Sequence, residues 1–154
     1  MASWYYTVSS DLSKIPDCIA FYENEFADAR GEISLRKRTI ERNSAELPGV
    51  VEYRFNQLQE IEAILEFLNI KLRKLRADKF KKYLEAYNKT LSSRDAEKYI
   101  DGEQEVVDMA MLINEFALIR NKYLGLIKGL DQKSWQLGHI TRLRVAGLDD
   151  ARIE

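Results

Sequence analysis

Three long segments of the chain place apolar residues three and four positions apart, which is the spacing of one face of an α-helix. In the first segment, residues 17–47, the members of this stripe are Ile19, Tyr22, Phe26, Ala29, Ile33 and Ile40. Pro16 and Asp17 open the segment, and Asp17 is suited to be the N-cap. The sequence Leu47-Pro48-Gly49 then predicts the end of the helix, because proline and glycine both disfavour a helix interior.

The second segment, residues 50–91, carries the most regular stripe. Its members keep the three-four spacing without interruption: Leu58, Ile61, Leu65, Leu68, Leu72 and Leu75. Such a seam needs a partner helix, from the same chain or from another copy. We expect one long helix over residues 50–91, followed by a loop from Ser92 to Gly102.

The third segment, residues 103–146, is expected to form the C-terminal helices. Its stripe consists of Leu112, Phe116, Ile119, Tyr123, Leu126 and Leu130. Gly125 and Gly129 predict a close approach of another helix backbone, since a glycine in a helix interior costs about 1 kcal/mol relative to alanine. A further helical stretch is expected to end at Gly147, so that residues 148–154 form a tail.

The first residues differ from these helical segments. Residues 1–16 contain the aromatic, β-prone run Trp4–Val8, which predicts a short strand or an extended arm. The whole chain has 154 residues, of which 45% are hydrophobic and 32% charged, with only 7 glycines and 2 prolines. That composition fits one folded, helix-rich domain. The predicted fold class is therefore all-α: a long-helix bundle with a short N-terminal β-prone arm.

Catalytic chemistry finds little support in the residue types. Cys18 is the one cysteine and His139 the one histidine, so neither a disulfide framework nor a zinc site of the usual kind can form. The two residues lie in different predicted helices, and glycine-rich phosphate loops are absent. The acidic residues near Asp101 to Asp108 suit the start of a helix better than a metal site. We predict that the protein is not an enzyme and uses no metal or cofactor.

The sequence also bears on where the protein works. No apolar run approaches the roughly 18–20 residues that a membrane-spanning helix needs. Met1-Ala2-Ser3-Trp4-Tyr5-Tyr6 lacks the basic start and apolar core of a signal peptide. We expect a cytoplasmic protein that makes no contact with a membrane.

The main candidate for function is a basic, aromatic-spaced run at the end of the second segment. Between residues 71 and 89 there are eight Lys or Arg residues against only Asp78 and Glu85, in a chain with a formal net charge of −1. Proteins that bind single-stranded nucleic acid without sequence preference generally combine positive charges that contact the phosphate backbone with aromatic rings on which the bases stack. The candidate DNA-binding residues are Lys71, Arg73, Lys74, Arg76, Lys79, Lys81, Lys82, Tyr83, Tyr87 and Lys89.

Two other interpretations of this run remain open. On one continuous helix, Asp78 and Glu85 fall at i, i+4 spacing from several lysines, as in Lys74–Asp78–Lys82, and such strings are common on exposed faces that bind nothing. The run could also contact an acidic surface of a protein partner. If it does not bind DNA, the next candidates are Lys133, Arg142 and Arg144.

A series of short motifs in the C-terminal half has a characteristic order and spacing. These motifs are Lys82-Tyr83-Leu84, Tyr99-Ile100-Asp101, Leu126-Ile127, Lys133-Ser134-Trp135-Gln136-Leu137, Ile140 and Ala146-Gly147. Over residues 70–147 they resemble the UvsY family of phage recombination mediators. The family's short basic DNA-binding motif is similar to Lys71-Leu72-Arg73-Lys74-Leu75-Arg76.

The resemblance implies a non-enzymatic function. Such a protein would bind single-stranded DNA and help a RecA-like recombinase to displace a single-strand-binding protein in the host cytoplasm. It would act as a ring-like homo-oligomer held by its C-terminal helices, and the apolar content of the last helix suits that role. The candidate oligomerisation residues are Leu126, Leu130, Trp135, Leu137, Ile140 and Leu143.

A second function class is a small helical adaptor or inhibitor protein, also plausibly phage-encoded. In that case the leucine seam is internal core, and the basic run binds an acidic protein partner. A structural phage component is a third interpretation.

Overall fold

The computed structural model describes residues 3–87 and 91–148. Five α-helices and two short 3-10 helices follow in the order α1 (Trp4–Ser10), η1 (Leu12–Lys14), α2 (Ile15–Ala29), η2 (Arg30–Ile33), α3 (Ile40–Tyr87), α4 (Ser93–Asp101) and α5 (Gln104–Val145). No strand occurs in the described part of the chain. The all-α fold class is confirmed.

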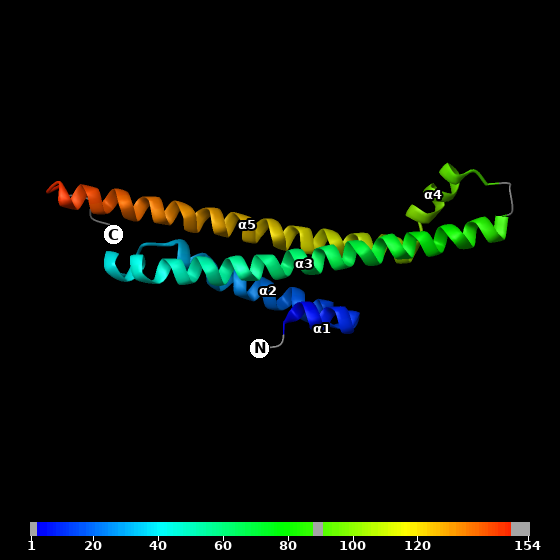
Figure 1. Ribbon diagram of the computed structural model, residues 1–154, viewed down its shortest axis with the longest axis horizontal. Coiled ribbons are helices and arrows are strands. Elements are labelled where there is room, and N and C mark those ends of the chain that lie inside the picture. Colours follow the sequence, from blue (N-terminus) through cyan, green and yellow to red (C-terminus); the bar gives the residue numbers. More distant parts are fainter. Residues whose placement is uncertain (1–2, 88–90, 149–154) are drawn as a thin grey trace.

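The two longest helices, α3 and α5, form an antiparallel hairpin (Figure 1). At 1.5 Å per residue, their 48 and 42 residues correspond to lengths of about 72 and 63 Å. The short helix α4 lies at the end where α3 leads into α5. α2 packs along the part of the hairpin nearer the start of α3, and α1 packs near its middle (Figure 1).

The leucine seam of the second segment is buried against α5, so its partner helix comes from the same chain. Leu58, Ile61, Leu65 and Leu68 join one core cluster with the predicted stripe of α5, including Phe116, Ile119, Tyr123, Leu126 and Leu130. α2 completes this core as a third layer. Beyond the reach of α2, Leu72 and Leu75 are only half-buried.

The break predicted at Leu47-Pro48-Gly49 is wrong, because α3 begins at Ile40 and runs through Pro48. The chain turns instead in residues 34–39, where Lys37 adopts a left-handed φ of 66°. Thr39 caps α3: its side-chain oxygen accepts a hydrogen bond from the Arg42 amide at 3.2 Å. Packing of Leu47 in the core outweighs the local cost of the proline.

The extended arm predicted over residues 1–16 is also wrong, because Trp4–Ser10 form α1. Its free N-terminal amides find a partner in α3: the Glu60 carboxylate accepts from the Tyr5 amide at 2.9 Å and from the Ser3 hydroxyl. Val8 is fully buried beneath the helix. A carboxylate 55 residues away thus caps this helix, which no local pattern reveals.

A buried ion-pair cluster fastens α2 and η2 to the hairpin. Arg54 of α3, whose side chain is only 6% exposed, binds Glu25 at 2.8 Å and Glu32 at 2.7 Å. Gln57 donates to the same Glu25 oxygen at 2.9 Å. Removing one partner of a buried ion pair typically lowers the free energy of unfolding by about 3–5 kcal/mol, because it leaves an unpaired charge. Lys133 is buried nearby and donates to the backbone carbonyl of Glu32 at 2.7 Å.

The C-terminal half contains more helix than predicted. The loop expected from Ser92 to Gly102 is mostly α4, with Ser92 as its N-cap. α5 is one helix where two segments were expected, and Gly147 ends it at φ 75° as predicted, with the Leu148 amide bonded to the Leu143 carbonyl. The residues after 148 lie outside the described part of the chain.

The two helical glycines of α5 behave differently. A Cβ at Gly129 would come within 2.8 Å of the Ile33 side chain in η2, so the close neighbour at this glycine is a side chain and not the helix backbone that was expected. Nothing lies within 4 Å of the corresponding position at Gly125, and the expectation for that residue is wrong. Asp17 falls in the first turn of α2, which begins at Ile15, and is not its N-cap.

We predict that replacing Pro48 with alanine stabilises the protein. The substitution restores a backbone donor to the Ser44 carbonyl, and the free energy of unfolding should rise by about 1–3 kcal/mol in denaturant titrations. Gly49→Ala is the matched control: its side chain would meet nothing within 4 Å, and about 1 kcal/mol is expected from helix propensity alone. A loss of stability in both variants would contradict a continuous α3.

Candidate nucleic-acid interface

The basic run lies on the last third of α3, at the end of the hairpin that carries α4 (Figure 1). Residues 71–82 sit on one continuous helix, as the sequence predicted. Tyr87 is the last residue of α3, and Lys89 lies outside the described residues. The remaining candidates divide into two groups according to the partners that the fold gives them.

The first group holds the hairpin together. Arg76 pairs with Asp101 at the end of α4. Lys79 lies 3.8 Å from Glu103 and 3.4 Å from Glu105, with its side chain only 15% exposed. These cations neutralise the acidic residues before and within the first turn of α5. They stabilise the fold and are therefore poor candidates for contacts with DNA.

Tyr83 belongs to this group as well. Its hydroxyl donates to Glu103 at 2.8 Å, and its ring stacks on Tyr99 of α4 with centroids 6.2 Å apart and an interplanar angle of 20°. Tyr99 is 59% exposed, so its ring remains accessible at this end of the molecule. Among the side chains that the structure describes, Tyr99 therefore offers an exposed ring for base stacking at this end, and the candidate DNA-binding residues did not include it.

The second group faces outward. Lys74, Lys81 and Lys82 are exposed, and in the described part of the chain none of them has an acidic partner within 4 Å. Lys71 lies over the Phe67 ring at 5.3 Å. Arg73 pairs with Glu66 at 2.8 Å, with both side chains more than 60% exposed, and such a surface pair is weak.

We call Lys71, Lys74, Lys81 and Lys82 the basic ridge. Asp78 and Glu85 are exposed on the same helix, but the i, i+4 pairs that the sequence allowed with Lys74 and Lys81 do not form among the described residues. The ridge keeps an excess of two positive charges over these two acids, fewer than the six that the whole run provides. The fold thus narrows the candidate interface to a few lysines.

A second basic cluster lies at the opposite end of the hairpin. Arg36 and Lys37 are exposed in the turn before α3, and Arg142 and Arg144 are exposed in the last turn of α5. Lys37 and Arg144 line one pocket of about 260 Å³. The run Arg36-Lys37-Arg38 was the sequence signal for this cluster. Lys133, named as an alternative DNA contact, is buried, and burial lowers the pKa of its amine, so it cannot serve as one.

The candidate oligomerisation residues also divide. Leu126, Leu130 and Leu137 are buried in the core of the single chain and are therefore not exposed to another copy in this structure. Trp135 is 67% exposed and Leu143 40% exposed, and Ile140 is half-buried. These three residues, with the exposed Val145, form the apolar surface that the C-terminal end of α5 offers to another copy.

Cys18 and His139, the candidate thiol and imidazole, lie in different environments and do not form a catalytic pair. Cys18 is fully buried in the core, where burial and the nearby Glu60 charge raise the pKa of its thiol to about 12. His139 is exposed on α5. Among the described residues there is neither a group of His, Cys, Asp and Glu side chains able to hold a metal ion nor a helix long and apolar enough to cross a membrane.

No protein-family model, curated protein or solved structure matches this chain.

We predict that the first group acts on stability and not on nucleic acid. Arg76→Ala removes the ion pair to Asp101 and should speed amide hydrogen exchange in α4 by about tenfold or less, since a partly exposed pair contributes about 1 kcal/mol or less. Lys74→Ala is the control and should leave exchange in α4 unchanged. Equal exchange in both variants would show that the pair does not hold α4.

Proposed function

We propose that this protein binds single-stranded DNA through the basic ridge of α3 and acts as a recombination mediator, helping a RecA-like recombinase onto DNA covered by a single-strand-binding protein. The observation that carries the DNA-binding part is a set of exposed lysines, Lys74, Lys81 and Lys82, that have no acidic partner within 4 Å among residues 3–87 and 91–148. The mediator part rests on the resemblance to the UvsY family.

The geometry of the ridge suits a flexible phosphate backbone. Lys74 and Lys81 are seven residues apart on one helix, which places them about 10 Å apart along its axis. The helix is rigid in this region because its other face is fixed by Arg76 and Lys79. The exposed Tyr99 ring at the same end supplies a surface on which a base can stack.

One ridge provides too little charge for tight binding. Each neutralised phosphate contributes a salt-dependent increment, and two excess charges give weak binding at physiological salt. Several copies that present their ridges together bind far more tightly, because each further contact is intramolecular. The proposal therefore includes self-association through Trp135, Ile140 and Leu143.

The DNA contact is tested by replacing Lys74, Lys81 and Lys82 together with alanine. We predict weaker binding to a single-stranded oligonucleotide, and a slope of log affinity against log salt that becomes less steep by about 2, because about 0.7 is lost for each phosphate contact. Filter binding at several salt concentrations measures both quantities.

The matched control removes three exposed cations elsewhere on the molecule, Lys14, Arg30 and Lys128. This control variant should keep the salt slope of the unmodified protein. It loses the same number of positive charges as the ridge variant, so a difference between the two variants reports a local contact and not a change in net charge. A third variant replaces Lys37, Arg142 and Arg144. If only this variant weakens binding, DNA contacts the opposite end of the hairpin and the ridge is not the site.

The self-association is tested at Trp135. We predict that Trp135→Ala lowers the average mass of the protein in sedimentation velocity experiments, because it removes the most exposed large ring of α5. Phe55→Ala, which removes an exposed ring of α3, is the control and should leave the mass unchanged. A monomeric unmodified protein at micromolar concentration would contradict the multivalent part of the proposal.

A second candidate function is the adaptor that binds an acidic protein. It is favoured by the ion pairs at Arg76 and Lys79, where the same stretch of α3 already binds acidic segments of its own chain. Met111 and Leu118, both more than half exposed on α5, add apolar surface for a protein partner. This function predicts no DNA binding even at low salt.

A further inference from the structure

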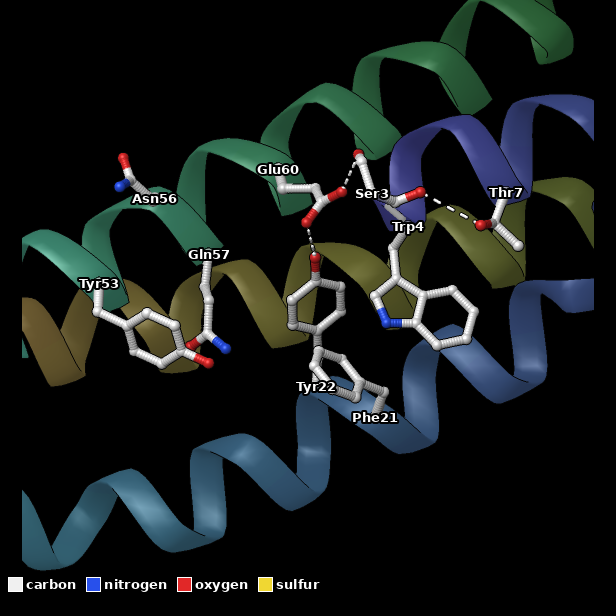
Figure 2. Close-up of a pocket in the computed structure, with 9 residues that line it drawn as sticks. All are labelled: Ser3, Trp4, Thr7, Phe21, Tyr22, Tyr53, Asn56, Gln57 and Glu60. Carbon is white, nitrogen blue, oxygen red and sulfur yellow. Dashed lines mark hydrogen bonds between the residues drawn. The ribbon is translucent and has the colours of Figure 1, made fainter. Parts of the chain in front are cut away.

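A cavity lies between α1, α2 and α3, and none of the basic-ridge residues lines it. It has a volume of about 600 Å³, within the range of small-molecule sites. Figure 2 shows its lining: Tyr22 and Phe21 come from α2, Trp4 from α1, and Tyr53 and Glu60 from α3. None of these residues has a part in the proposed DNA contact.

Four of the nine lining residues are aromatic. The rings of Trp4 and Phe21 have centroids 5.6 Å apart, and those of Phe21 and Tyr22 have centroids 5.2 Å apart, so these three form one continuous wall. Tyr53, 48% exposed, lies on the other side of Tyr22 from Trp4 in Figure 2. Trp4 and Phe21 are half-buried, whereas Tyr22 is fully buried behind them.

Glu60 is the one charged residue of this lining. Its Oε1 accepts from the Ser3 hydroxyl and from the Tyr5 amide, and its Oε2 accepts from the Tyr22 hydroxyl at 2.7 Å. All of these donors are neutral, and no cation of the described residues lies within 4 Å of the carboxylate. Although burial raises the pKa of Glu60, the hydrogen bonds outweigh it, and the pKa lies below its ordinary value of 4.5. The carboxylate is ionised at neutral pH.

The surroundings of the cavity add further negative charge. Glu25 accepts hydrogen bonds from Gln57 and Tyr53, which both line the cavity. Arg54 lies over the Tyr53 ring at 5.0 Å and is shared between Glu25 and Glu32, so two carboxylates outweigh its charge. The described charges around the cavity are therefore net negative, which favours a cation over an anion, and the faces of the rings attract a cation as well.

We infer that this cavity binds an organic cation, an alkylated ammonium group carried on an apolar body, held between the aromatic rings with Glu60 as its counter-ion. Rings arranged around a cavity with a carboxylate at the edge form the kind of cage that recognises quaternary and methylated ammonium groups. The volume leaves room for an apolar body beside the ammonium head.

Choline and its uncharged isostere 3,3-dimethyl-1-butanol test the inference, because they differ only in the charge of the head group. Calorimetric titrations of the full chain should show choline binding at least about tenfold more tightly, as expected for desolvated cation–π contacts with a counter-ion. Hexyltrimethylammonium should bind more tightly than choline, because its chain occupies the apolar part of the cavity.

Nuclear magnetic resonance locates the ligand independently. The chain has two tryptophans, and the indole signal of Trp4 should shift during the titration while that of Trp135 on α5 does not. Equal affinity for choline and its isostere, or a titration in which the Trp4 signal does not move at millimolar choline, would overturn the inference.

A matched pair of variants on α3 distinguishes the loss of a cavity ring from the loss of any exposed ring on this helix. Tyr53 and Phe55 are two residues apart and similarly exposed, at 48% and 47%, but only Tyr53 lines the cavity. Tyr53→Leu should weaken choline binding about threefold to tenfold, while Phe55→Leu leaves it unchanged. Equal effects in the two variants would count against the cage.

Glu60→Gln removes the counter-ion and should weaken choline binding by at least about tenfold without changing the affinity for the isostere. Because Glu60 also caps α1, circular dichroism must show that this variant is folded. If it does not fold, the Tyr53 and Phe55 pair still decides the question. None of these outcomes depends on whether the basic ridge binds DNA.

Discussion

The apolar seam between α3 and α5 is the interaction on which the rest of the structure depends. The two helices pair over a length that no third helix covers completely, because the 15 residues of α2 span only about 22 Å. Where α2 is present, the seam is a dry three-layer core fixed by Arg54. Beyond α2, apolar burial is incomplete, and ion pairs of Arg76 and Lys79 also hold α3 against α4 and the start of α5.

Because ion pairs replace apolar burial beyond α2, only some of the positive charges on α3 remain available for a partner. The cations that face α4 and the start of α5 are neutralised by the chain's own acidic residues, while Lys74, Lys81 and Lys82 on the exposed face have no acidic partner in the part of the chain that the structure describes. The proposed contact is consequently narrow and weak in a single copy, and it gains strength by repetition. The cavity beneath α1 is a separate consequence of the same architecture, because Glu60 both holds α1 in place and supplies the charge.

Periodicity sufficed to predict the two long helices and most of the core, since the stripes of α3 and α5 are buried against each other. It failed where distant contacts overrule local preference. Pro48 is tolerated inside α3 because the flanking residues pack on the core, and Trp4–Ser10 become helical with Glu60 as a distant cap. The basic run was visible in the sequence, but its division into paired and free cations depends on α4, which was expected to be a loop. The buried state of Leu126 likewise follows from the position of α2 and α3.

The measurement that tests the central claim most directly is the affinity of the unmodified protein for single- and double-stranded oligonucleotides of equal length, followed by fluorescence anisotropy across a salt series. The account predicts a preference for the single strand, with affinity that falls steeply as salt increases. Absence of binding to the single strand at low salt would contradict it.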